Sequence, residues 1–133
     1  MTNFKLNIVT PDGEFYNGEA QKVIVRTIVG DVCILAKHTE YMSALGLGIA
    51  KITIDGKQNT AACINGMITV SNGNVRIVAT TFEWSKDIDK ARAEKAKAKA
   101  EKALADKNLD SMMQDFYELK LKRALVRLGA SDN

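Results

Sequence analysis

The chain has 133 residues, 46% of them hydrophobic and 26% charged, which is typical of one ordinary globular domain or of a small domain with an appendage. Its formal net charge of +3 is weak, and no nucleic-acid recognition motif accompanies it, which argues against nucleic-acid binding. No apolar run reaches the ~18 residues of a transmembrane helix, so we expect membrane contact only through partner proteins.

Residues 1–86 have the pattern of short strands separated by turns. Residues 4–8 alternate between apolar and polar side chains, and so do residues 49–54, which is the period of a half-buried strand. Residues 21–28 are rich in β-branched side chains. Turns are indicated at Pro11-Asp12-Gly13, Asp55-Gly56, Asn65-Gly66 and Asn72-Gly73. About ten short strands in this length predict an antiparallel β-sandwich.

Residues 87–133 have the pattern of two helices. Residues 88–105 contain no Gly or Pro and are dominated by strong helix formers, with Asp87 as the expected N-cap. After a short break, a second helix is expected from residue 109 or 110 to 128, with Gly129 as its stop. Lengths of ~27 and ~30 Å suit an antiparallel hairpin, so the whole chain is predicted to have an α+β fold.

The predicted hairpin is positively charged and weakly packed. Residues 88–133 hold eleven Lys/Arg and eight Asp/Glu, whereas residues 1–87 hold eight of each. The first helix offers its partner mainly small side chains, namely Ala91, Ala93, Ala96, Ala98, Ala100 and Ala103. Burial contributes only ~0.8 kcal/mol per CH₂, so an alanine face gains little stability. We therefore expect a hairpin that is able to detach and change its pose.

No residue pattern indicates catalysis. A nucleophile–base pair, a metal-ligand cluster and paired carboxylates are all missing from the sequence, so neither an enzyme nor a metal site is predicted. Cys33 and Cys63 lack metal-ligand spacing and are expected to be reduced thiols, although a disulfide between them stays open.

Five segments together resemble one family, the epsilon subunit of F-type ATP synthases. Residues 30–38 resemble its G-E-x-G-I-x-P-G-H segment, although Cys33, Ala36 and Lys37 depart from that pattern and predict a different loop conformation. The other four are Asn65-Gly66-Met67-Ile68-Thr69-Val70, Asn74-Val75-Arg76-Ile77-Val78-Ala79, Ile88-Asp89-Lys90-Ala91-Arg92-Ala93 and residues 121–128, which resemble the L-K-R-A-x-x-R-L motif of the second helix. The segments occur in order along essentially the whole chain.

The resemblance implies a non-catalytic rotor-stalk subunit at the cytoplasmic face of the bacterial cell membrane. It implies that residues 1–86 bind the gamma subunit and the c-ring, with Asp31 and His38 as contact residues. It also implies that residues 87–133 move between a folded pose and an extended pose that inhibits ATP hydrolysis in the alpha/beta catalytic head. In the extended pose, the implied contacts with the beta subunit are Lys120, Lys122, Arg123 and Arg127.

In several bacterial members of the family the folded hairpin binds one regulatory ATP; no other cofactor is implied. The matching residues here are Glu83, Ile88, Asp89, Arg92, Ala93, Lys99, Arg123 and Arg127. Helical spacing supports part of this set, because residues three or four apart share a helix face. The same charges also suit a solvated helix surface and the helix dipole, so both interpretations stay open. A stand-alone ATP-sensing module that needs no rotor partner is the alternative function.

Overall fold

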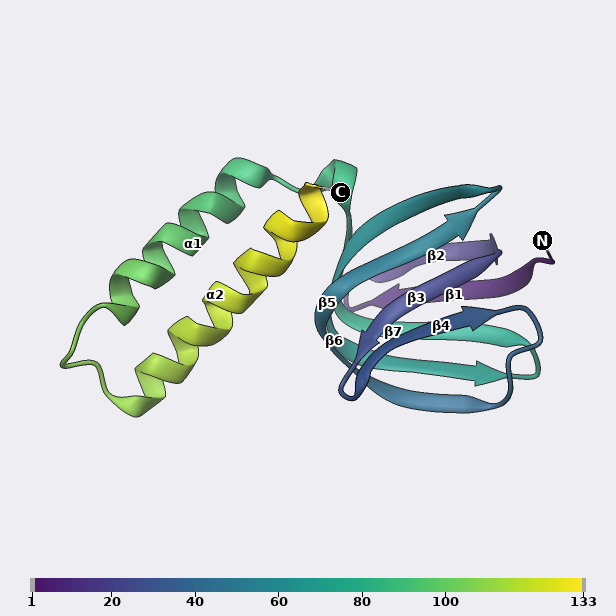
Figure 1. The fold of residues 1–133 in the computed structure, drawn as a ribbon, viewed down its shortest axis with the longest axis horizontal. Coiled ribbons are helices and arrows are strands. Elements are labelled where there is room, and N and C mark those ends of the chain that lie inside the picture. Colours follow the sequence, from purple (N-terminus) through teal and green to yellow (C-terminus); the bar gives the residue numbers. More distant parts are fainter. Residues whose placement is uncertain (1, 133) are drawn as a thin grey trace.

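The computed structural model describes residues 2–132 and has the expected α+β architecture, a β-sandwich followed by a two-helix hairpin (Figure 1). The described residues form seven strands: β1 (Phe4–Thr10), β2 (Gly13–Ala20), β3 (Lys22–Thr27), β4 (Gly30–Leu35), β5 (Tyr41–Ile54), β6 (Lys57–Ser71) and β7 (Asn74–Trp84). They are hydrogen-bonded in the order β2-β1-β7-β6-β5-β3-β4, and all pairs are antiparallel except β1 with β7. The fold class is confirmed.

The strand number differs from the expected ten because β5 and β6 are long. They contain 14 and 15 residues, and they curve strongly so that each takes part in both layers (Figure 1). Asn65-Gly66, expected to be a turn between two strands, is instead a bend inside β6, with φ of 53° at Asn65 and 142° at Gly66. One strand therefore replaces two of the predicted ones.

The core lies between the two layers of the sandwich. Alternating residues of each strand point inward, and the largest fully buried side chains are Leu6, Ile8, Val23, Val25, Ile34, Ile52, Ile64, Ile68 and Ile77. Cys63 is buried among the strands, and Cys33 is exposed; both thiols are free. Burial raises the pKa of the Cys63 thiol to about 12, so this side chain stays protonated and inert at neutral pH.

One residue in the loop of residues 36–40 has a left-handed backbone conformation. Lys37 has a φ of 63°, in the left-handed region that favours glycine, and the family pattern has glycine at this position.

A short 3₁₀ turn, η1 (Ser85–Asp87), leads from the sandwich to α1 (Lys90–Leu104) and α2 (Ser111–Ser131). The N-cap of α1 is Asp89, whose carboxylate accepts a 3.0 Å hydrogen bond from the Arg92 backbone, so the prediction of Asp87 was wrong. Ile88 is extended, which delays the start of the helix. Neither helix is long and apolar enough to cross a membrane.

The second helix extends beyond its predicted end. Gly129, expected to end the helix, lies inside α2. A Cβ there would be 3.3 Å from Cδ1 of Ile49, so the glycine lets the helix approach β5 closely. The helices pack through small buried residues, Ala93 and Ala100 of α1 and Ala124 of α2, while Ala130 is buried near the end of α2. The C-terminal end of α2 lies against the sandwich, and the connection between the helices points away from it (Figure 1).

We predict that Gly66→Ala lowers the free energy of unfolding by about 3 kcal/mol, because the new Cβ would overlap the backbone of Val78 and Ala79. Gly73→Ala is the matched control: Gly73 also has a positive φ, of 77°, but no heavy atom within 4 Å of the added Cβ. The control should lose only ~1 kcal/mol, from the left-handed backbone alone. Urea unfolding followed by circular dichroism measures both, and equal losses would contradict the close approach at Gly66.

Candidate functional site

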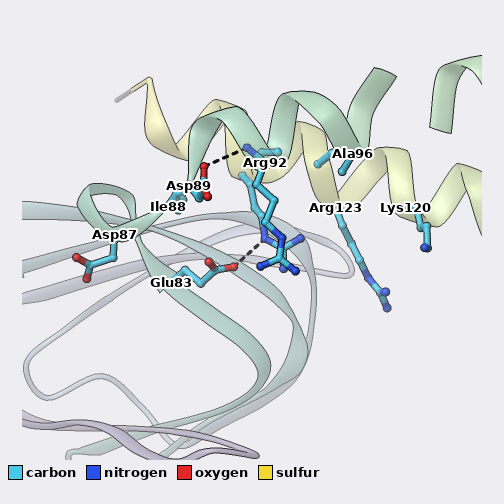
Figure 2. Close-up of a pocket in the computed structure, with 11 residues that line it drawn as sticks. Glu83, Asp87, Ile88, Asp89, Arg92, Ala96, Lys120 and Arg123 are labelled. Atoms are coloured by element: carbon cyan, nitrogen blue, oxygen red, sulfur yellow. Dashed lines mark hydrogen bonds and ion pairs between the residues drawn. The ribbon is translucent and has the colours of Figure 1, made fainter. Parts of the chain in front are cut away.

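A cavity of about 480 Å³ lies where the hairpin meets the end of the sandwich. We call it the hairpin cavity; its lining residues are Glu83, Asp87, Ile88, Asp89, Arg92, Ala93, Ala96, Lys120, Arg123, Ala124 and Arg127. The volume falls within the range of small-molecule sites, about 300–1,000 Å³. Figure 2 shows these side chains on the last strand, on the turn that follows it, and on both helices.

The sequence positions the cations of the cavity through helical spacing. On α2, Lys120, Arg123 and Arg127 are three and four residues apart, so they form one stripe along the helix. On α1, the Asp89 cap fixes the first turn, and Arg92 extends from that turn toward Glu83 (Figure 2). Because the hairpin is antiparallel, the start of α1 lies beside the end of α2, and the cations of the two helices converge.

One ion pair joins the hairpin to the sandwich across the cavity. The Arg127 Nε donates to the Glu83 Oε1 at 2.7 Å, and both side chains are about one-third exposed, at 32% and 34% (Figure 2). A pair this accessible contributes on the order of 1 kcal/mol or less.

The other α2 cations of the cavity lack carboxylate partners. Among the described residues, neither Arg123 nor Lys120 has a carboxylate within ion-pair distance. The Arg123 Nε is buried and has no hydrogen-bond partner. A buried donor without an acceptor is costly, so this nitrogen indicates a site that an anionic ligand would complete.

The structure brings together seven of the eight residues predicted for a nucleotide, all except Lys99. Lys99 is exposed on α1 outside the cavity lining. The sequence reasoning missed Asp87, Ala96 and Ala124 as lining residues and assigned Lys120 only to the inhibitory contact. Spacing alone could have found Lys120, which is three residues from Arg123, and Ala96, which is four residues from Arg92.

The predicted contact residues are dispersed over the surface. Asp31 lies at the start of β4 and pairs with Arg26 at 2.8 Å. His38 lies beyond the other end of β4, where its Nδ1 donates to the Thr39 carbonyl at 2.8 Å. The two residues are therefore not parts of one small patch. Of the predicted inhibitory residues, Lys122 is exposed outside the hairpin cavity, and the other three line it.

A second ion pair closes the base of the hairpin. Lys90, the first residue of α1, pairs with Asp132 just beyond α2 at 2.8 Å. The Asp132 carboxylate beside Lys90 raises the pKa of the Lys90 ammonium, by hydrogen bonding and by its charge. Both side chains are more than half exposed, so the pair fixes the geometry of the helix ends more than it adds stability.

The sandwich also has an apolar groove on the outer face of β5, β6 and β7, opposite the core residues Ile68 and Ile77. We call it the strand groove; it has a volume of about 650 Å³ and is lined by Pro11, Met42, Gly66, Met67, Thr69, Arg76, Val78, Ala79 and Thr80. Met42, Met67 and Val78 are large apolar side chains with exposures of 66%, 42% and 47%. Contiguous exposed apolar side chains of this kind mark interaction surfaces.

No three His, Cys, Asp or Glu side chains within residues 2–132 come together as a metal site. The four aromatic rings nearest the domain junction, those of Phe15, Tyr16, Phe82 and Trp84, form one cluster on β2 and β7. Trp84 therefore packs against the sandwich at the base of the hairpin.

Two family models together match nearly the whole chain. Residues 3–85 match the β-sandwich domain of the ATP synthase delta/epsilon chain, and residues 86–132 match its long alpha-helix domain. The boundary between the two matches falls between β7 and α1.

Individual proteins give the same result. The ATP synthase epsilon chain of Shouchella clausii is 36% identical over 131 residues, covering 98% of this chain and 96% of the relative. That of Ruminococcus albus is 37% identical over 133 residues, covering 99% and 98%. A chain in the cryo-EM structure of the Euglena gracilis mitochondrial ATP synthase superposes with a TM-score of 0.84 at 21% identity, covering 100% of this chain and 83% of that chain. This last likeness concerns the fold.

Proposed function

The chain belongs to the delta/epsilon-chain family of ATP synthase subunits and is a non-catalytic subunit, and we propose that it is a rotor subunit of the central stalk of a bacterial F-type ATP synthase. In this role it helps to couple ion translocation to ATP synthesis, at the cytoplasmic face of the cell membrane. A chain in the cryo-EM structure of the central stalk and c-ring of the Tetrahymena thermophila mitochondrial ATP synthase has a similar fold, with a TM-score of 0.63 at 14% identity, covering 96% of this chain and 95% of that chain.

We assign the strand groove to the gamma subunit. Its exposed Met42, Met67 and Val78 form an apolar surface that gamma would bury on binding. Burial of apolar surface suits an interface that stays closed during rotation. Asp31 and His38, at opposite ends of β4, are proposed as separate contact points on gamma and the c-ring. This assignment treats residues 1–86 as the rotor-binding domain.

We assign residues 87–133 to regulation and the hairpin cavity to one ATP molecule. The observation that carries this assignment is the buried Arg123 Nε, which has no partner in a cavity where four cations face three carboxylates. Arginine suits phosphate because its planar fork donates two hydrogen bonds at once. Ile88 and Ala93 offer apolar surface to a purine, and Glu83 offers an acceptor once Arg127 turns to the phosphates.

The same charges serve the inhibitory pose. When the hairpin extends, Lys120, Lys122, Arg123 and Arg127 meet acidic surfaces of the catalytic beta subunits, and charge complementarity sets the specificity of that contact. Three of these four residues line the hairpin cavity in the folded pose, so ATP and the catalytic head compete for them.

We predict that Arg123→Gln weakens ATP binding to the full chain by about tenfold or more, because charge-assisted hydrogen bonds to phosphate are lost. Isothermal calorimetry measures the binding directly. Arg76→Gln, a change of the same type at an exposed position on β7, should bind as the unaltered chain does. An unaltered chain that binds no ATP, or equal losses in both variants, would refute the nucleotide assignment.

Neutralising the four inhibitory residues to Gln together should raise ATP hydrolysis by the assembled complex, because the extended hairpin loses its attraction to the catalytic head. The matched control removes four other hairpin charges, at Lys95, Lys97, Lys102 and Lys107. Hydrolysis by complexes containing each variant is compared at low ionic strength, where exposed charges act most strongly. Unchanged hydrolysis in the first variant, or an equal rise in both, contradicts the inhibitory role.

Met67→Asp is expected to reduce copurification with gamma by about tenfold, because a carboxylate in the centre of an apolar interface is desolvated without a partner. Met112→Asp is the control, since Met112 is 79% exposed on α2. Circular dichroism checks that both variants are folded. A stand-alone ATP sensor would show no copurification even before substitution, which separates the rotor function from that alternative.

A further inference from the structure

The charged groups of the hairpin cavity are divided between two ends. The carboxylates of Glu83, Asp87 and Asp89 all come from the sandwich side, on the last strand, the η1 turn and the cap of α1. The α2 cations start beside them at Arg127, which Glu83 neutralises, and continue along the helix away from the sandwich. Arg92 and Arg127 lie at the carboxylate end, so the far end, with Arg123 and Lys120, is the part of the cavity that holds cations without carboxylates.

Lys120 is the cation of α2 that lies furthest from the sandwich in this cavity. It is seven residues before Arg127, which corresponds to about 10 Å along the helix axis. Its ammonium lies 4.7 Å from the centre of the Phe116 ring. That contact leaves the ammonium free to bind an anion, because among residues 2–132 no carboxylate lies within ion-pair distance of it. Figure 2 shows Lys120 and Arg123 extending from α2 toward the same side.

An ATP molecule in the hairpin cavity has one favoured direction. Its base fits the sandwich end, where Ile88 is half-buried and Glu83 supplies an acceptor, while its phosphates avoid the three carboxylates of that end. The phosphate chain then follows the cations of α2, and its last phosphoryl group reaches furthest from the sandwich. We infer that Lys120 binds the terminal phosphoryl group and thereby makes the cavity prefer ATP over ADP.

This inference rests on the proposed binding of ATP. It replaces Lys99 by Lys120 among the residues that bind the phosphates. Lys99 was among the residues expected to bind the nucleotide, but it is exposed on α1 and does not line the cavity. Lys120 lies on the facing helix and does line it. The cation for the end of the phosphate chain therefore comes from α2.

The test compares ATP and ADP binding to the full chain by calorimetry, at one fixed Mg²⁺ concentration, for four single variants. Lys120→Gln should weaken ATP binding about tenfold and ADP binding by no more than about twofold, because only ATP has the phosphoryl group that Lys120 contacts. Lys120→Arg should keep the preference for ATP, since it keeps the charge. Lys99→Gln and the control Lys107→Gln, in the connection between the helices, should change neither affinity.

Each other outcome has a definite meaning. Equal losses for ATP and ADP in Lys120→Gln would show a general electrostatic effect and overturn the inference, and so would a loss of the ATP preference in Lys99→Gln. Unchanged affinities in Lys120→Gln would overturn it as well, while leaving the nucleotide assignment intact. An unaltered chain that binds neither nucleotide would overturn both.

Discussion

The fully buried side chains of the hairpin are all small, and the properties proposed for its regulatory half depend on this weak packing. The buried residues of the helices are Ala93, Ala100, Ala124 and Ala130, and each buried methyl group contributes only ~0.8 kcal/mol. Gly129 lets α2 approach Ile49 of β5 closely, but the apolar area buried between this helix and the strand is small. The Lys90–Asp132 pair is more than half exposed to solvent, and the Arg127–Glu83 pair is about one-third exposed. Such a hairpin has a defined folded pose that costs little to leave, which a two-pose regulator requires.

The same folded pose creates the hairpin cavity and places like charges close together in it. Arg92 on α1 and three cations on α2 converge only while the helices are packed, and their mutual repulsion opposes that packing. Glu83 offsets the charge of Arg127, whereas Arg123 has no such partner. An anionic ligand that binds only the folded pose stabilises it by an amount that grows with ligand concentration. On the proposed function, weak helix packing and unbalanced charge together make the folded pose sensitive to an anionic ligand.

Local patterns in the sequence predicted the kinds of element, and the family resemblance predicted most of the cavity, but both failed where tertiary packing decides. Asn65-Gly66 has the composition of a turn, yet β6 continues through it because neighbouring strands on both sides keep it paired. Gly129 suits a helix end, yet α2 continues because its last turn packs on β5. Seven cavity residues were implied by the family resemblance, and helical spacing in an antiparallel hairpin explains why the charged residues of the two helices among them meet. The sequence did not predict that Lys99 lies outside the cavity, because that depends on where the facing helices close the cavity.

The position of Lys120 links the two poses through a single set of charges. In the folded pose Lys120, Arg123 and Arg127 face the hairpin cavity, so a phosphate chain bound there occupies the groups that an acidic partner surface would need. In the proposed extended pose these groups would leave Glu83 and the other carboxylates of the sandwich end and become available to that partner. The same cations cannot bind a phosphate chain and an acidic partner surface at once. Coupling between the two partners therefore requires no conformational change transmitted between distant sites. On the proposed function, antagonism between nucleotide and inhibition follows from competition for the same cations, and its strength is set by how many of them each partner engages.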